Sequence, residues 1–153
     1  MLNEEFPQLQ VMQQLGRTYR AMLSAFVANT GQPMPRWRVL LTLHQLGELS
    51  QKQLATVLPM DPASLTRQLK SMEQLGWIER HTDALDNRLT NVALTEAGLS
   101  VVEQVLPRRS RFIEKAFSDF SLDEMDTLSR LLGTLEARLR LENQGNPDGP
   151  DKI

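Results

Sequence analysis

The chain has 153 residues, of which 41% are hydrophobic and 24% are charged, and this composition predicts one globular domain with a real core. It contains no cysteine and two histidines, so disulfides, metal sites and cofactors are not predicted. The formal net charge of -2 argues mildly against a nucleic-acid partner, although the placement of a few cations can outweigh the total. No apolar run approaches the roughly 20 residues that cross a bilayer, and no secretion signal is apparent, which predicts a cytoplasmic protein without a membrane partner.

The first part of the chain predicts two helices separated by a short break. Across residues 9–27, apolar residues recur at the three-four spacing of an amphipathic helix. Gly31 and Pro33 end that helix, and Pro35 suits the first turn of the next one. Gly47 is placed to end the second helix in a left-handed conformation.

Two further helices follow, each with a recognisable start. Ser50 and Gln53 form a capping-box pattern for a short third helix. Asp61 and Pro62 supply the N-cap and first-turn proline of a fourth helix, which Gly76 ends. The face of the fourth helix opposite its apolar stripe, with its flanks, consists of Ala63, Ser64, Thr66, Arg67, Lys70 and Gln74. Such a polar face suits base edges in the major groove, and an ordinary solvated face is the alternative.

A β-hairpin is predicted directly after the fourth helix. Residues 77–82 and 89–94 mix aromatic or β-branched residues with polar ones. The turn between them includes Asp83, Asp86 and Asn87. Arg88 lies at the tip, where a cation can enter the narrow minor groove of DNA, and Asp86 is close enough to hold its guanidinium in one orientation. For the turn residues alone, the alternative to DNA contact is a plain β-turn without a binding role.

A fifth helix is predicted to begin at Thr95, which can cap it, and to run to about Asp119. Pro107 lies inside this range. Because an internal proline removes one backbone hydrogen bond and clashes with the preceding turn, we expect either a kink near residues 103–107 or two separate helices.

The last predicted helix begins with a second capping box, Ser121 with Glu124, and is strongly amphipathic. The polar, Gly- and Pro-rich residues 143–153 predict a flexible tail. The first helix and the last two carry more apolar surface than a small helix-turn-helix needs. This surplus predicts a helical dimer interface.

Together these motifs resemble the MarR family of dimeric winged-helix transcription regulators, and its SlyA-like members in particular. The motifs are a capped Ser-x-x-x-Leu-Ala helix, an arginine-bearing helix, Gly-Trp-Ile-Glu-Arg, an Asp-x-x-Asp-x-Arg wing and Leu-Thr-Glu-Ala-Gly. The resemblance implies a mainly α fold with a small β-wing. It further implies one domain over residues 1–142, with a DNA-binding part at about 35–95, dimerisation helices at about 8–31 and 96–142, and a tail at 143–153.

The resemblance also implies which residues contact DNA. The fourth helix enters the major groove, where Arg67 can bond guanine bidentately, while the wing approaches the minor groove and the third helix touches phosphate. The residues assigned to this interface are Ser50, Gln51, Pro62, Ala63, Ser64, Thr66, Arg67, Lys70, Asp86, Asn87 and Arg88. Relatives often carry basic residues where this chain has His81 and Asn87, so a gentler salt dependence is predicted.

Members of this family often sense small aromatic acids or phenolic compounds in a crevice near the dimer interface. The residues with suitable chemistry here are Arg17, Tyr19, Arg36, Trp37 and His44. For Tyr19 and Trp37 a place in the core is the alternative, and for His44 a hydrogen-bonded place on a helix.

The predicted function is sequence-specific binding of double-stranded DNA by a homodimer on inverted repeats, as a repressor that a small aromatic or phenolic ligand releases. The alternative is a winged-helix dimer that acts as a protein-interaction scaffold without specific DNA binding. An enzyme is not predicted, because the sequence has no cluster of nucleophile, base and oxyanion donors and no phosphate-cradling glycine loop.

Overall fold

A computed structural model describes residues 6–144 of the chain. The chain divides into two compact units, the first running to Ile113 and the second beginning at Glu114. The predicted domain boundaries stay a prediction. From residue 145 onward the predicted tail lies outside the described residues, whereas Asn143 and Gln144 are the last residues of a helix. Over residues 6–144, no helix is both long and apolar enough to span a membrane.

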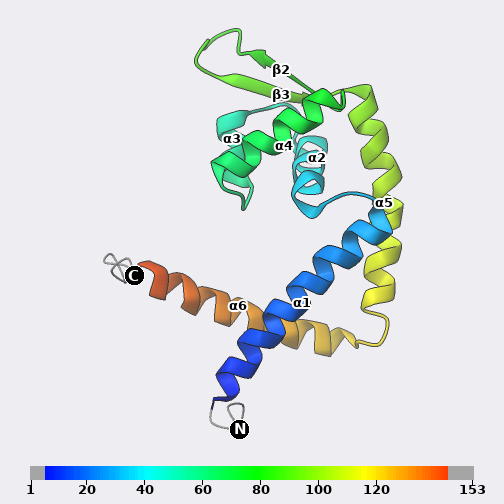
Figure 1. The fold of residues 1–153 in the computed structure, drawn as a ribbon, viewed down its shortest axis with the longest axis vertical. Helices are drawn as coiled ribbons and strands as arrows, with labels where there is room; N and C mark the ends of the chain where they lie inside the picture. Colours follow the sequence, from blue (N-terminus) through cyan, green and yellow to red (C-terminus); the bar gives the residue numbers. More distant parts are fainter. Residues whose placement is uncertain (1–5, 145–153) are drawn as a thin grey trace. The chain divides into compact units, whose positions relative to one another are not determined.

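The order of elements is the predicted one with one addition. The elements are α1 (Pro7–Thr30), α2 (Met34–Leu46), β1 (Leu49–Ser50), α3 (Gln51–Val57), α4 (Pro62–Gln74), β2 (Ile78–Thr82), β3 (Thr90–Leu94), α5 (Glu96–Ala116) and α6 (Leu122–Gln144) (Figure 1). The addition is β1, which has only two residues and therefore leaves no periodic signal in the sequence. A mainly α fold with a small sheet is confirmed.

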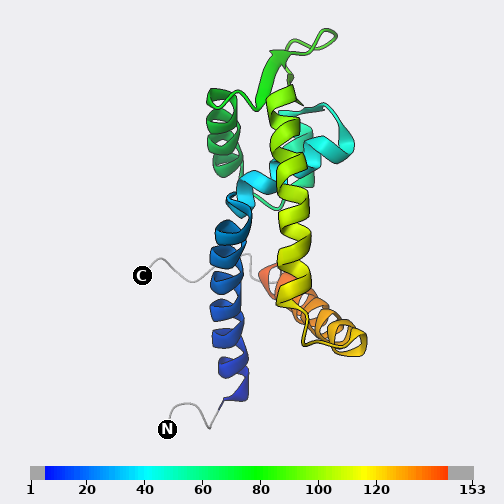
Figure 2. The same ribbon diagram turned by 90° about the vertical axis from the view of Figure 1, so that its right-hand side faces the viewer.

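The three strands form an antiparallel sheet in the order β1-β3-β2. In the hairpin, Ile78 pairs with Leu94 at the base and Thr82 with Thr90 toward the tip. The loop between β2 and β3 projects past α3 and α4 (Figures 1 and 2). On the other edge of β3, Leu49 pairs with Val92, which attaches the residues before α3 to the middle of the hairpin.

The predicted helix starts are confirmed by their capping bonds. The Ser50 hydroxyl accepts the Gln53 backbone N–H at 3.0 Å, and the Gln53 side chain accepts the Ser50 N–H at 2.8 Å. Gly31 ends α1 as expected, and it does so in the left-handed conformation, with φ 77° and ψ 4°. For Gly47 the expectation is wrong: φ is 78°, but ψ is -160°, so the chain leaves α2 extended and enters β1 directly.

The core of the first unit lies where α2, α4 and the sheet meet. On α4 the predicted apolar stripe, Leu65, Leu69 and Met72, is fully buried. The buried apolar residues are Phe26, Trp37, Val39, Leu40, Leu43, Leu54, Leu58, Leu65, Leu69, Met72, Ile78, Val92, Val102 and Val105. Because one face of α4 is held this way, its opposite face must point to solvent.

Helix α5 is continuous through Pro107, so the alternative of two helices is wrong. Val102 and Val105 are buried directly before the proline, and Phe112 beyond it meets Phe26 edge-on with ring centroids 6.0 Å apart. Packing on both sides of the proline therefore holds one helix despite the lost backbone bond. The helix ends at Ala116 rather than Asp119.

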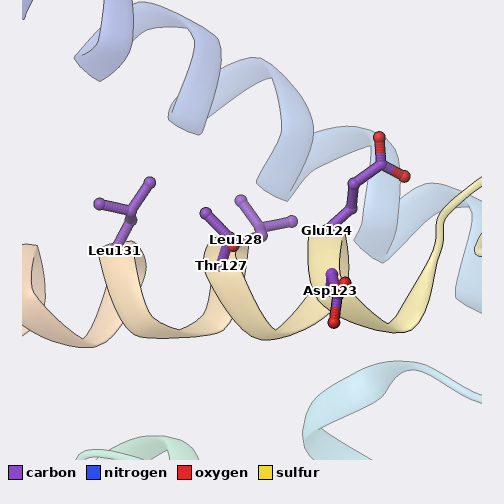
Figure 3. Close-up of a pocket in the computed structure, with 5 residues that line it drawn as sticks. All are labelled: Asp123, Glu124, Thr127, Leu128 and Leu131. Atoms are coloured by element: carbon purple, nitrogen blue, oxygen red, sulfur yellow. The ribbon is translucent and has the colours of Figure 1, made fainter.

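The second unit consists of the end of α5 and the whole of α6. The predicted capping box is confirmed, because Ser121 and Glu124 exchange hydrogen bonds of 2.8 and 3.1 Å. No residue of α6 is buried. A shallow hollow of about 350 Å³ on this helix is lined by Asp123, Glu124, Thr127, Leu128 and Leu131 (Figure 3). The leucines of α6 thus form an uncovered apolar surface.

Candidate nucleic-acid interface

The exposed face of α4 begins with three connected side chains. One oxygen of the Asp61 carboxylate accepts the Ser64 backbone N–H at 2.9 Å, and the other accepts the Ser64 hydroxyl at 2.5 Å. The Ser64 oxygen in turn accepts an N–H of the Arg67 guanidinium at 2.9 Å. The bonds from Ser64 hold the pKa of the Asp61 carboxyl below its ordinary value, and the charge of Arg67 adds to this effect.

The remaining predicted residues of α4 are placed as the sequence analysis expected. Pro62, Ala63, Thr66 and Lys70 are exposed on the helix surface, while Ser64 is half-buried. The Thr66 hydroxyl donates to the Pro62 carbonyl at 2.9 Å. Within residues 6–144, Lys70 has no hydrogen-bond or ion-pair partner. The helix therefore presents one held cation, Arg67, and one free cation to solvent.

The start of α3 lies next to α4. The Gln51 amide donates to the Thr66 hydroxyl at 3.5 Å, a long contact that joins two of the predicted DNA-binding residues. Ser50 is only 6% exposed, and its hydroxyl oxygen is occupied by the cap of α3. The structure thus brings Gln51 toward the polar face of α4, whereas Ser50 is mainly a structural residue of this cap.

At the hairpin tip, Arg88 and Asp86 form the predicted pair. The guanidinium donates from Nε to one carboxylate oxygen at 3.0 Å and from Nη2 to the other at 3.1 Å. The Arg88 side chain is 86% exposed. This bond lowers the pKa of the Asp86 carboxyl and raises that of Arg88. The cation at the tip is therefore oriented and open to solvent, while Asn87 beside it is exposed.

Asp83 organises the same turn, a role the sequence analysis treated only as turn chemistry. One of its oxygens accepts the backbone N–H groups of Leu85 and Asp86 at 2.8 and 2.9 Å. The other accepts the Asn91 amide at 2.8 Å, across the hairpin. An aspartate at the first turn position followed by a polar residue on the returning strand is the signal for this arrangement. Asp83 therefore stiffens the loop that carries Arg88.

Two further basic residues, Arg80 and Lys52, lie on elements next to α4 and the wing. Arg80 on β2 forms a two-bond ion pair with Glu73 near the end of α4, with both distances 2.9 Å, so its charge is already neutralised. Lys52 on α3 is exposed, and its charge lowers the pKa of Asp86 in the wing. Lys52 was not among the residues predicted from the sequence, although a cation two residues after the N-cap of α3 is a usable signal. The cations with open side chains around this surface are Lys52, Arg67, Lys70 and Arg88.

The predicted ligand residues are distributed over α1 and α2. Trp37 is buried at 2% exposure, in agreement with the core alternative, whereas Tyr19 is 50% exposed and His44 is exposed. The guanidinium of Arg36 lies 5.6 Å from the centre of the Trp77 ring and donates to the Ser71 hydroxyl at 3.2 Å.

Arg17 bonds to Gln14 on its own helix at 2.8 Å. The Arg36 side chain contacts α4 and the residue before β2, and the Arg17 side chain bonds within α1. The structure therefore does not bring these residues together through their hydrogen bonds.

The hydrogen bonds of Asp83 predict that the stability of the fold falls in acid. Bonding to Asn91 and to the turn backbone lowers the folded-state pKa of Asp83 from its ordinary value of 3.8. These bonds to ionised Asp83 therefore stabilise the folded state fully above pH values near 3.8. That stabilisation is lost as the pH falls through the lowered pKa. Asp83→Asn should make urea unfolding less dependent on pH in this acid range. The control Asp119→Asn removes a carboxylate with no hydrogen-bond or ion-pair partner among residues 6–144, and it should cost less stability at neutral pH than Asp83→Asn.

Comparison with known proteins matches the part of the chain that contains α3, α4 and the loop of the hairpin. A family model described as the MarR family matches residues 33–90, from the start of α2 to the start of β3. The uncharacterised HTH-type transcriptional regulator YdgJ of Bacillus subtilis (strain 168) is 31% identical over 131 residues, which cover 86% of this chain and 77% of that protein.

Two solved structures extend the likeness of the fold over the chain. A mutant MarR from E. coli complexed with operator DNA has 24% identity and a TM-score of 0.73, covering 88% of this chain and 97% of that one. The organohalide-sensing RdhR regulator in its 2,4-dichlorophenol-bound form has 18% identity and a TM-score of 0.83, covering 90% and 83%. The winged-helix architecture is therefore confirmed.

Proposed function

This chain belongs to the MarR family of DNA-binding transcription regulators, which are not enzymes, and from that premise we propose that it acts as a homodimer on an inverted-repeat operator. Each subunit inserts α4 into a major groove and its wing into the neighbouring minor groove. Two-fold symmetry of the dimer requires two half-sites of opposite direction, with centres about one helical turn apart.

The observation that carries this proposal is the Arg88–Asp86 pair on a stiffened hairpin. An oriented guanidinium that is 86% exposed is suited to the narrow minor groove, where the negative potential of DNA is concentrated. Asp86 is a carboxylate in a place where phosphates would repel it. Its bidentate bond to Arg88 offsets that repulsion, and the role of the aspartate at this position is to orient the guanidinium.

The proposed roles on α3 and α4 follow from exposure and chemistry. Arg67 reads guanine, Ala63 and the Thr66 methyl contact thymine methyl groups, and Ser64 and Pro62 bring the helix backbone near the groove. Gln51 and Lys70 bind phosphate, and Lys52 joins them on the strength of its exposed charge near the wing. Ser50 contributes mainly through the cap of α3.

Dimerisation is supported by apolar side chains that each unit leaves uncovered. In α1 the predicted apolar stripe is largely exposed, since Leu9, Met12 and Met22 remain open to solvent. In α6 the exposed leucines are Leu122, Leu128, Leu131, Leu132, Leu139 and Leu141. A monomer rarely leaves so many large apolar side chains in water, whereas a helical interface with a second copy would cover them.

A small aromatic or phenolic ligand is proposed to release the repressor from DNA. The support is a similarly folded regulator solved with 2,4-dichlorophenol, together with the arginine and aromatic residues of α1 and α2. Of the residues proposed for this site, Arg17, Tyr19 and His44 are open to solvent. Arg36 contacts Ser71 on α4, so a ligand that moved Arg36 would disturb the helix that reads DNA.

A salt titration tests DNA binding against the scaffold alternative. If the four open cations Lys52, Arg67, Lys70 and Arg88 of each subunit are the ones near phosphate, log affinity should fall with log salt with a slope no steeper than about -7. The duplex is first selected from random sequences with the purified protein, and binding is measured by fluorescence anisotropy. A steeper slope would mean that another basic surface takes part, and the absence of a preferred duplex would favour the scaffold.

A further inference from the structure

The first turns of α4 contain a connected set of side chains, Asp61, Ser64 and Arg67, which we call the α4 triad. The three residues are spaced by three and therefore share one face of the helix. Asp61 receives the Ser64 hydroxyl at 2.5 Å, and Ser64 receives the Arg67 guanidinium at 2.9 Å. A hydroxyl that donates to a carboxylate becomes a better acceptor, so the two bonds reinforce each other.

We propose that Asp61 and Ser64 are positioning residues that orient the guanidinium of Arg67 before DNA arrives, and so set the base preference of the operator at one position in each half-site. The proposal rests on the proposed function, because it assigns a base-reading role to Arg67. It goes beyond that function by assigning a role to Asp61 and Ser64, which influence the choice of base through Arg67 without contacting a base themselves.

The geometry leaves Arg67 able to read a base. A guanidinium has five N–H donors, and Ser64 uses one of them, so a fork of two donors stays available for the O6 and N7 atoms of guanine. An exposed arginine loses side-chain entropy when it binds. Holding it in place beforehand reduces that loss and also penalises base pairs that do not match the fixed direction of the fork.

Lys70 provides an internal comparison on the same helix. It is also exposed and cationic, and among residues 6–144 it has no partner. A free ammonium bonds phosphate equally well in many directions, whereas a held guanidinium is directional. The two cations are therefore expected to differ in kind, with Arg67 setting preference and Lys70 adding affinity.

The test uses substitutions that keep α4 capped. In Ser64→Ala the backbone N–H that Asp61 accepts is retained, and alanine is a better helix former than serine. In Asp61→Ser the new hydroxyl can still cap the helix, because serine and aspartate are equally good N-caps, but the second oxygen that receives Ser64 is lost. Both variants should unfold like the parent.

Binding is measured with the duplex that the parent selects from random sequences and with its single-base-pair variants. Arg67→Ala should lose about fivefold to a hundredfold of preference at one guanine position. Ser64→Ala and Asp61→Ser should each lose about threefold to tenfold at that same position. Lys70→Ala, the matched control, should weaken binding to every duplex alike.

The double variant separates positioning from direct contact. If Ser64 acts through Arg67, adding Ser64→Ala to Arg67→Ala changes nothing further. An equal loss in both backgrounds would mean that Ser64 touches DNA itself, which overturns the proposal. Unchanged preference in Ser64→Ala, or tighter binding, would overturn it as well.

A measurement without DNA keeps this proposal distinct from the proposed function. In nitrogen-15 NMR of the free protein, the Arg67 side chain should be more ordered than that of Arg130 on α6, and Ser64→Ala should abolish the difference. An Arg67 as mobile as Arg130 overturns the proposal whatever the DNA results are. An ordered Arg67 in a protein that prefers no duplex overturns the proposed function, and leaves the α4 triad as a helix cap without a reading role.

Discussion

Arg88→Ala is expected to reduce operator affinity by about tenfold to a hundredfold for each subunit, and to leave the fold intact. The reason is that the side chain is 86% exposed and, within the described residues 6–144, its side-chain hydrogen bonds go to Asp86 alone, so it contributes little to the core. Its removal from both wings of a dimer would compound the loss. The measurement is a DNA titration at fixed salt, with thermal unfolding as the check on the fold.

Arg88→Lys is the matched variant, because it retains the charge and removes the planar fork. Lysine cannot form the same two-bond pair with Asp86, so the cation would no longer be oriented. We expect the salt dependence of Arg88→Lys to resemble that of the parent, with an affinity between those of the parent and of Arg88→Ala. If Arg88→Ala bound DNA with the affinity of the parent, the assignment of the wing to the DNA interface would be wrong.

Gly98→Ala is expected to destabilise the protein by at least about 3 kcal/mol, at or above the usual upper end for overpacking. A Cβ atom at Gly98 would lie 2.0 Å from the carbonyl oxygen of Trp77 and 2.9 Å from its carbonyl carbon. Both are backbone atoms, so no side-chain rotation relieves the clash. The same oxygen accepts the Thr95 N–H at 3.0 Å, and the base of the wing would have to separate from α5.

Gly16→Ala is the control for this substitution. Gly16 lies within α1, and the nearest atom to an added Cβ is the far end of the Arg20 side chain at 3.7 Å. Replacing a glycine inside a helix should stabilise it by about 0.5–1 kcal/mol. Urea unfolding of both variants at one protein concentration measures the difference, and equal stability of Gly98→Ala and the parent would contradict the close packing of α5 on the wing.

Features that depend on near neighbours in the chain could be predicted. The caps at Ser50, Asp61 and Ser121 were predictable because each bonds a residue three positions away. The Arg88–Asp86 pair was predictable for the same reason, since its members are two positions apart within one turn. Such contacts form as soon as the local backbone is in place.

Features that join distant segments could not be predicted. Glu73 neutralises Arg80 only because the end of α4 lies beside β2, and the charge of Lys52 helps to lower the pKa of Asp86 because α3 packs against β3. Pro107 predicted a broken helix as one alternative, yet packing of Val102, Val105 and Phe112 keeps α5 continuous. These outcomes depend on which surfaces meet in three dimensions.

The sequence by itself determined the order of the helices, the hairpin, the polar face of α4 and the identity of the cation at the wing tip, because periodicity and capping are short-range properties. Only the tertiary structure decided which charges are open and which are held. It ties Arg80 to Glu73, seven positions away, and among residues 6–144 it leaves Lys70 without a hydrogen-bond or ion-pair partner. A side chain's availability to a partner depends on its neighbours in space, and the burial of one face of α4 decided which neighbours those are.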